Sequence, residues 1–379
     1  MEDLESKIRQ EELEFWPIGQ SDHPAGSLPV SLAKLGTLHG SAALRFTIDA
    51  VSKTTTMFCR DLPAAARAAR IDALIVDQTE PAGGSVAEHV GLPFVTVANA
   101  LTINRDPIAP PPFTPWTYRD AWWALARNYV GYSMADWVTR PVWKVIRRYR
   151  TEWKLRPLGS QDESFSRLSQ ISQMPRGFDF PRAALPARFE YVGPLRRSLP
   201  MVVPFPWERL DGRPMVYASL GTLQNSRAPV FRTFAEACVG LDVQLVVSHG
   251  GGLTPEEAGS LPGDPLVVTY APQFELLSRA TLTITHAGLN TVLDSLANGV
   301  PLVTVPITYE QPAIARRVEW TGVGRSVSFR TLRASGLAVA IRDVLATPDY
   351  RRAAVGLCEE IQQAGGVRKA ASIIEAATR

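Results

Sequence analysis

Short apolar runs alternate with segments of helical periodicity along most of this chain. In the second half, five runs are typical of buried parallel strands: MVYASLG (215–221), VQLVVSHG (243–250), LVVTYAP (266–272), LTITHAG (282–288) and PLVTVPI (301–307). Between the last two, the apolar residues of LNTVLDSLANG (289–299) recur at helical spacing until a glycine ends the pattern. Alternation of strand and helix predicts a doubly wound parallel sheet, that is, an α/β domain of Rossmann type.

The first half carries the same alternation in a weaker form. Strands are predicted at 13–18, ALIVD (73–77), FVTVANA (94–100) and FEYVGPL (189–195). Helical spacing runs through 31–70 and 118–155, and an extended proline loop is predicted at PIAPPPFTPW (107–116). A proline-rich segment without periodicity follows the predicted strand at 189–195 and indicates a linker. We therefore expect a first domain at 1–198, a linker at 199–212 and a second domain at 213–362.

Composition narrows the class of protein only slightly. The chain has 379 residues, an apolar content of 45% and a net charge of +3, so a nucleic-acid partner is not expected. Its cysteines, Cys59, Cys238 and Cys358, lie far apart, which favours neither a disulfide framework nor a metal site and predicts a reducing, cytoplasmic location. Because the sequence has no secretory leader and no apolar run of about 18 residues, a membrane-spanning helix is not expected either.

Residues that can carry chemistry follow two neighbouring strands of the second half. The strand before His286 and Gly288 leads directly into a helix, and Glu310 and Gln311 follow the next strand. The free N–H groups and positive dipole end of such a helix attract anions, and glycine lets the backbone approach a phosphate closely. Both pairs would lie at the carboxyl edge of the sheet, where α/β proteins bind ligands. The alternative is that His286 is a buried residue of a helix-capping turn.

At these residues the chain resembles a known family. APQ (271–273), HAGLNTVLD (286–294) and EQ (310–311) are similar in order and spacing to the sugar-nucleotide signature of the family 1 glycosyltransferases, which have the GT-B fold. Residues 77–116 resemble the zeaxanthin glucosyltransferases of bacteria, and VYASLGT (216–222) fits the same family. The resemblance implies an α/β protein with two Rossmann-like domains facing across a cleft. It also implies a C-terminal helix at 363–379 that crosses back to the first domain.

The resemblance assigns a nucleotide-sugar site to the second domain. Contacts to the diphosphate would come from Ser219, Gly221, Thr222, His286, Gly288 and Asn290, and Thr291 would also bind the nucleotide sugar. Tyr270 would stack on the nucleobase, with a place at the rim of the core as an equal alternative. Gln273 would face the base or ribose, and Asp294 would bind the ribose hydroxyls unless it lies on a solvated helix face. Glu310 and Gln311 would bind the sugar.

In the first domain the resemblance points to Asp77, which ends a strand. The matching aspartate of the family orients a histidine that removes the proton of the acceptor hydroxyl, whereas the alternative for Asp77 is a helix N-cap. The family opens with an apolar strand and a glycine–histidine turn, which we do not find, and His23, His39 and His89 do not take that place. We therefore expect an incomplete first domain, whether the sequence is truncated, naturally short or completed by another chain.

The implied activity is inverting transfer of a sugar, with glucose as the first candidate, from a UDP-sugar to a hydroxyl of a hydrophobic acceptor. A carotenoid, another terpenoid or a polyketide would fit the tryptophan-rich helix and the proline loop. The UDP-sugar is a co-substrate, and neither a cofactor nor a metal ion is expected. The alternative function is a nucleotide-sugar-binding protein with weak or no transfer activity.

Two further partners are expected. The basic, aromatic segment 143–156 could contact an anionic membrane surface, although a solvated helix face would have the same composition. An incompletely packed first domain would also favour a homo-oligomer.

Overall fold

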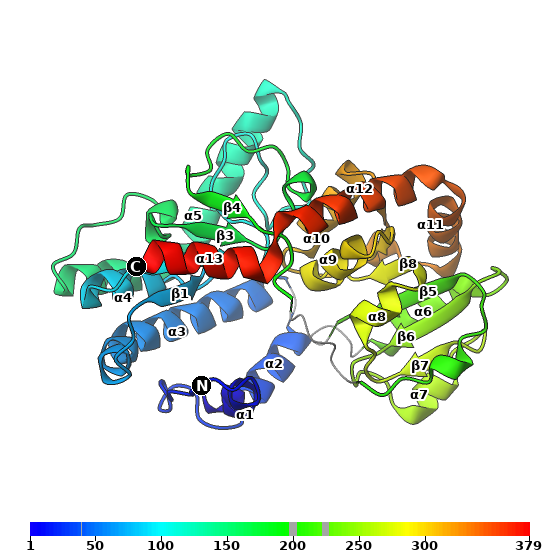
Figure 1. The fold of residues 1–379 in the computed structure, drawn as a ribbon, viewed down its shortest axis with the longest axis horizontal. Helices are drawn as coiled ribbons and strands as arrows, with labels where there is room; N and C mark the ends of the chain where they lie inside the picture. Colours follow the sequence, from blue (N-terminus) through cyan, green and yellow to red (C-terminus); the bar gives the residue numbers. More distant parts are fainter. Residues whose placement is uncertain (39, 197–202, 222–226) are drawn as a thin grey trace.

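The computed structural model describes residues 1–38, 40–196, 203–221 and 227–379, so His39, Thr222 and the start of the expected linker lie outside the described residues. Two α/β units lie side by side, each with its own parallel sheet (Figure 1). The predicted fold class is therefore confirmed.

A four-stranded parallel sheet forms the centre of the first domain. Its strands, in spatial order, are β1 (Leu74–Asp77), β2 (Phe94–Ala98), β3 (Gln170–Ser172) and β4 (Phe189–Tyr191). The helices are α1 (Glu5–Gln10), α2 (Ser27–Thr37), α3 (Gly40–Ala68), α4 (Gly83–Val90) and α5 (Trp122–Glu152), with short 3-10 turns at η1 (Glu2–Leu4), η2 (Gln161–Ser164) and η3 (Arg176–Phe178). Three predicted strands, at 73–77, 94–100 and 189–195, are confirmed.

The strand predicted at 13–18 is wrong. Leu13 and Trp16 are exposed there, and the segment pairs with no strand of the described residues. At its end the backbone N–H of Gly19 donates to Asp61 of α3 over 3.1 Å, so a loop contact holds the segment instead. A short, mostly apolar segment forms a strand only where a sheet edge is within reach, and the local sequence does not report that.

Strand β3 was not predicted because its signal is short and polar. Ile171 is its one apolar residue, while Gln170 and Ser172 are buried polar side chains. The amide of Gln170 donates to the carbonyl of Ser166 over 3.1 Å and accepts from Asn104 over 2.9 Å. Hydrogen bonds between distant segments thus offset the burial of these polar groups, which a sequence pattern does not reveal.

The second domain contains a six-stranded parallel sheet. Its strands are β5 (Met215–Ser219), β6 (Gln244–Ser248), β7 (Leu266–Val268), β8 (Ala280–Thr285), β9 (Leu302–Thr304) and β10 (Gly324–Ser326), and their spatial order is β10-β9-β8-β5-β6-β7. The helices are α6 (Ala228–Cys238), α7 (Pro255–Gly259), α8 (Gln273–Leu277), α9 (Leu289–Ala297), α10 (Gln311–Trp320) and α11 (Ala334–Ala346), with 3-10 turns at η4 (Trp207–Arg209) and η5 (Phe329–Thr331). The chain reverses its direction of strand addition between β5 and β8, which is where open α/β sheets bind ligands.

Helices cover both faces of this sheet, which explains its continuous apolar strands. Along β5, Val216 packs with Phe231 and Ile341 of α6 and α11, while the next residue, Tyr217, packs with Leu276 of α8. The five strands predicted here are confirmed. They were recognisable in the sequence because strands that are buried on both faces appear as unbroken apolar runs. The sixth, β10, was missed because it contains no large apolar residue.

The two C-terminal helices, α12 (Pro348–Ala364) and α13 (Gly366–Thr378), connect the domains. Helix α12 packs on α9, whereas α13 lies on the first sheet, where Ala370 contacts Val95, Ile171 and Val192 (Figure 1). Gly365, at a φ of 91°, makes the bend between the two helices. The last helix therefore crosses back to the first domain.

A buried ion cluster joins the domains. Asp179, in the first domain, accepts hydrogen bonds from Nη2 of Arg317 on α10 over 2.8 Å and from Nε of Arg182 over 3.0 Å. The hydroxyl of Tyr191 donates to the same carboxylate over 2.9 Å, and the Arg317 guanidinium lies 4.2 Å from the ring centre of Phe180. Burial alone would raise the pKa of Asp179, but the guanidinium groups of Arg182 and Arg317 outweigh it and hold that pKa at about 2.

Replacing Arg317 by methionine should destabilise the protein strongly. The substitution leaves Asp179 buried with fewer compensating charges, and removal of one partner of a buried ion pair costs about 3–5 kcal/mol. Urea unfolding followed by tryptophan fluorescence measures the effect. Arg352→Met is the matched control, because that side chain is 75% exposed and should change stability by no more than about 0.5 kcal/mol.

The same cluster predicts a pH dependence. Because the folded pKa of Asp179 lies below its ordinary value of 3.8, the pair stabilises the fold above that pH and loses its effect as pH falls towards 2. The stability difference between the unmodified protein and Arg317→Met should therefore shrink in that acid window. A difference that stays constant from neutral pH down to 2 would contradict the role of the charge.

Candidate functional site

The candidate site lies at the carboxyl edge of the second sheet. Strand β5 ends at Ser219, and β8 ends one residue before His286, so both lead into the point where the strand order reverses. Glu310 follows the neighbouring strand β9 and stands at the start of α10. The topology therefore brings together three segments that are distant in the sequence.

Two glycines lie close to the His286 imidazole. A Cβ at Gly288 would lie 2.6 Å from Nε2 of His286, and a Cβ at Gly221 would lie 2.9 Å from its Cε1. No larger residue fits at either position unless the imidazole moves. Ala287, at a φ of 66°, makes the sharp turn from strand to helix and is fully buried. The fold thus brings the backbone of two loops close to the Cε1–Nε2 edge of one ring.

Burial keeps the His286 imidazole neutral. It lowers the pKa of this side chain to about 4, and a hydrogen bond with the backbone of Ser219 opposes the shift only in part. A neutral imidazole has one N–H, so it can donate to one acceptor at a time. Ser219 also orders its own turn, because its hydroxyl accepts from the N–H of Gly221 over 3.2 Å.

The amino end of α9 provides the anion-binding feature of the site. Gly288 is the N-cap and supplies no capping side chain, so backbone N–H groups of the first turn remain for a ligand. Asn290 is in this turn, and its side-chain oxygen accepts from Gln173 of the first domain over 3.2 Å. The helix start therefore lies at the interface of the two domains.

Gln273, Thr291 and Asp294 form one hydrogen-bonded network. Nε2 of Gln273 donates to Asp294 over 2.6 Å, while its oxygen accepts from Tyr217 over 3.2 Å and from Thr291 over 3.4 Å. The other Asp294 oxygen accepts from Nε of Arg196 over 2.5 Å. Asp294 is buried, so it does not lie on a solvated helix face. A ribose hydroxyl would have to share this carboxylate with Arg196, which the sequence did not single out.

The structure separates the roles of Glu310 and Gln311. The side-chain oxygen of Gln311 accepts from the backbone N–H groups of Ile307 and Thr308, both over 2.9 Å, and so orders the loop after β9. Among the described residues its NH₂ group has no partner and remains available. Glu310 is partly exposed beside Tyr309, whose φ of 54° is the left-handed conformation. Tyr270 is 57% exposed at the end of β7, so its ring is free to stack.

Asp77 has a local partner. Its carboxylate accepts from the backbone N–H and the hydroxyl of Thr79, over 2.8 and 2.5 Å, which orders the turn after β1. Within the described part of the chain, no histidine is hydrogen-bonded to it: His89 stacks on Trp153 with ring centres 4.3 Å apart, and His23 contacts Thr54 over 3.4 Å.

Glu80, in the same turn as Asp77, was missed by the sequence analysis. Burial raises the pKa of its carboxyl to about 7, and the charge of Asp77 acts in the same direction. A carboxyl with a near-neutral pKa at the end of a strand has the acidity of a general base. Its position in the turn that follows β1 was the available signal. The described residues hold no cluster of histidine, cysteine, aspartate and glutamate that could bind a metal ion.

Gly288→Ala should displace the His286 ring. The backbone conformation at Gly288, with a φ of −66°, accepts alanine, so the effect isolates the contact between Cβ and imidazole. We expect a loss of about 1–3 kcal/mol in thermal unfolding and a shifted His286 NMR signal. Gly336→Ala in α11 is the control, because a Cβ there meets nothing within 4 Å and alanine favours a helix. Equal behaviour of the two variants would contradict the packing described for His286.

Comparison with known proteins agrees with this geometry. The family model described as UDP-glucoronosyl and UDP-glucosyl transferase matches residues 41–363. A zeaxanthin glucosyltransferase of Pantoea ananas is 37% identical over 98% of this chain and 87% of its own length. Another, of Pseudescherichia vulneris, is 40% identical over 87% of this chain and 79% of its own.

Solved structures match the fold as well. The glycosyltransferase of kitacinnamycin covers 89% of this chain and 84% of its own, with a TM-score of 0.71 and 21% identity. This likeness shows the GT-B fold, and the family match covers both sheets and the loops around His286 and Glu310. The chain therefore belongs to the UDP-glucuronosyl and UDP-glucosyl transferase family, and it is a glycosyltransferase of that type.

Proposed function

We propose that this enzyme transfers a sugar, with glucose as the first candidate, from a UDP-sugar to a hydroxyl of a hydrophobic acceptor. The observation that carries the proposal is the neutral His286 imidazole beside the uncapped start of α9, at the domain interface. A diphosphate placed there would receive N–H donors and the positive end of the helix dipole. The two similar enzymes named zeaxanthin glucosyltransferases support the choice of glucose and of a hydrophobic acceptor.

The rest of the donor follows from the neighbouring side chains. The exposed ring of Tyr270 would stack on the base, and the Gln273–Asp294 pair would receive the ribose hydroxyls. The Glu310 carboxylate would accept from sugar hydroxyls, and the unpaired NH₂ of Gln311 would donate to one. His286, Gly288, Asn290 and Thr291 would surround the diphosphate, together with the turn at Ser219, Gly221 and Thr222.

The acceptor would enter from the first domain. A cavity of about 210 Å³ is lined by Pro107, Leu125, Tyr129 and Tyr132, with Arg105 and Asp106 at its side. Its mostly apolar wall suits one end of a carotenoid, another terpenoid or a polyketide.

The chemistry is a single in-line displacement. The acceptor oxygen forms its bond to the anomeric carbon while the bond from that carbon to the diphosphate oxygen breaks on the opposite face, which inverts the centre. The diphosphate leaves with the bonding electron pair, and N–H groups at α9 stabilise its charge. The hydroxyl proton passes to a base of the first domain, for which Asp77 and Glu80 are the described carboxyl candidates.

The one N–H of the neutral His286 imidazole would have to turn from the Ser219 carbonyl to the bound diphosphate. His286→Ala removes this donor and should weaken UDP binding by about 1–3 kcal/mol. Calorimetry with UDP measures this. His249→Ala is the control, since that buried histidine accepts from the Leu253 N–H within the second domain and lies at the end of another strand, β6. If UDP affinity is unchanged in a folded His286→Ala variant, the diphosphate site is not at α9.

UDP binding by the unmodified protein without transfer to any hydroxyl acceptor would favour the alternative function, a nucleotide-sugar-binding protein.

Sugar choice should depend more on Glu310 than on Gln311. Glu310→Gln removes an acceptor for sugar hydroxyls and should change the ratio of kcat/KM for UDP-glucose and UDP-galactose by about tenfold or more. Gln311→Ala frees the backbone N–H groups of Ile307 and Thr308, so it should lower stability as well as activity. An unchanged donor ratio in Glu310→Gln would show that the carboxylate does not contact the sugar.

A further inference from the structure

The solvent side of α5 carries a continuous apolar stripe. Trp122, Tyr129 and Trp137 are 80%, 75% and 72% exposed, and Val130 and Met134 are exposed beside them. With about 3.6 residues per turn, these positions fall on one side of the helix. Single exposed apolar side chains are ordinary, but five along four turns form a patch that indicates a binding surface.

The opposite side of α5 is already packed. Ala124, Asn128, Gly131 and Tyr132 are buried against the first domain, and the amide of Asn128 donates to the carbonyl of Pro107 over 3.1 Å. The amino end of the helix stands at the top of the first domain (Figure 1). The stripe is therefore the outer face of an anchored helix and not the core face of a loosely packed one.

The same outer face becomes basic in the second half of the helix. Arg140 lies five turns after Trp122, Lys144 two turns after Trp137, and Arg147 five turns after Tyr129, so the cations continue the stripe. All three are exposed, and no acidic side chain of the described residues is within ion-pair distance of them. The face thus combines aromatic rings and unpaired positive charge in one row.

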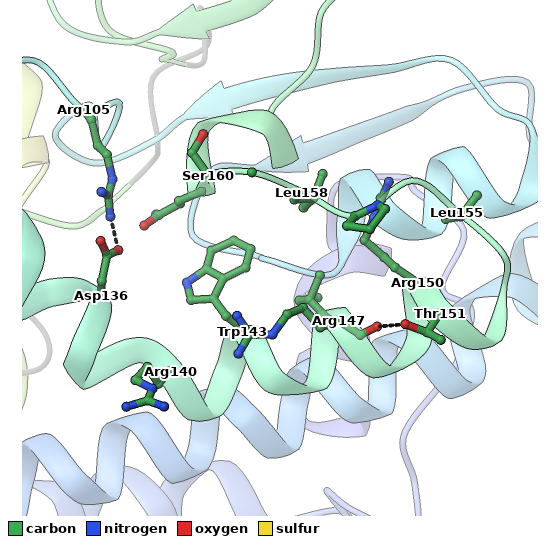
Figure 2. Close-up of a pocket in the computed structure, with 14 residues that line it drawn as sticks. Arg105, Asp136, Arg140, Trp143, Arg147, Arg150, Thr151, Leu155, Leu158 and Ser160 are labelled. Atoms are coloured by element: carbon green, nitrogen blue, oxygen red, sulfur yellow. Dashed lines mark hydrogen bonds and ion pairs between the residues drawn. The ribbon is translucent and has the colours of Figure 1, made fainter.

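An arginine-lined hollow flanks this row. A cavity of about 380 Å³ lies between α5 and residues 155–161, and Arg105, Arg140, Arg147, Arg150 and Trp143 line it (Figure 2). Arg105 is paired with Asp136, and Arg150 with Glu88 over 2.7 Å, whereas Arg140 and Arg147 are not compensated within the described part of the chain. The hollow therefore has the charge and the size to receive an anionic group such as a phosphate.

We propose that the outer face of α5 docks on the surface of a bilayer that contains anionic phospholipids. Trp122, Tyr129 and Trp137 enter the interfacial layer, where amphipathic rings are favoured, and Arg140, Lys144 and Arg147 contact lipid phosphates. A second copy of the chain fits less well, because its matching face would bring the same positive charges together. Within the described residues no helix has the length and apolar character to cross a membrane, so the protein would lie on the surface.

This inference goes beyond the transfer reaction, since it needs neither a donor nor an acceptor. Docking of α5 would bring the first domain, with the apolar cavity beside Tyr129, to the lipid surface. A hydrophobic acceptor dissolves in that lipid, so the enzyme would be close to its substrate.

Vesicle co-sedimentation of the full chain tests the proposal. We expect binding to phosphatidylcholine vesicles that contain phosphatidylglycerol, weaker binding to phosphatidylcholine alone, and loss of binding at high salt. Lys144→Gln with Arg147→Gln should reduce the partition coefficient by roughly fivefold for each charge removed. Trp122→Ala with Trp137→Ala should reduce it by roughly tenfold or more.

Matched controls lie elsewhere on the surface. Arg330→Gln with Arg333→Gln removes two exposed cations of the second domain, and Trp16→Ala removes another exposed indole. Both should bind vesicles like the unmodified protein, and all variants should keep their transfer to a water-soluble acceptor. The proposal fails if anionic vesicles do not bind, or if the controls lose as much binding as the α5 variants. It also fails if the α5 tryptophans instead control a concentration-dependent dimer, because the face would then join two copies.

Discussion

The buried pair of Asp179 and Arg317 is the interaction on which the rest of the structure depends. A charge without water is tolerated only with near-ideal partners, so this pair allows one placement of α10 against the first domain. Helix α10 begins at Gln311, and Asp179 lies just after the segment in which Gln173 reaches Asn290. One ion cluster therefore sets the position of the loop that leads into α10 and of the first-domain residues near the start of α9.

The site itself relies on backbone geometry more than on charge. His286 is neutral, and its position comes from the close approach of two glycine loops at the ends of β5 and β8. In the proposed donor site, attraction for a diphosphate would come from aligned N–H groups and a helix dipole, which would need no reorganisation when the leaving group gains charge. Positive charge is placed elsewhere, on the outer face of α5, where Lys144 and Arg147 remain unpaired among the described residues.

Prediction from the sequence succeeded where burial is uniform. The five runs of the second sheet are apolar on both faces, so each was recognisable without knowledge of its neighbours. It failed for β3, where Gln170 is buried with hydrogen bonds to Ser166 and Asn104, and for residues 13–18, a mostly apolar segment that meets no sheet edge. The motif named the candidate site residues, and it could not name Arg196 and Glu80, because their contacts and acidity arise only in the fold.

What the sequence by itself determined was the α/β class, five of the six strands of the second domain and the family, because these follow from periodicity and from spaced motifs within one stretch of chain. The tertiary structure decided which polar groups of the candidate site are still free to bind a ligand. Asp294 is shared with Arg196, the Gln311 oxygen is bound to its own loop, and Asp77 is held by Thr79. Such outcomes depend on distances between segments that are far apart in the chain, and burial then sets the protonation of groups such as His286.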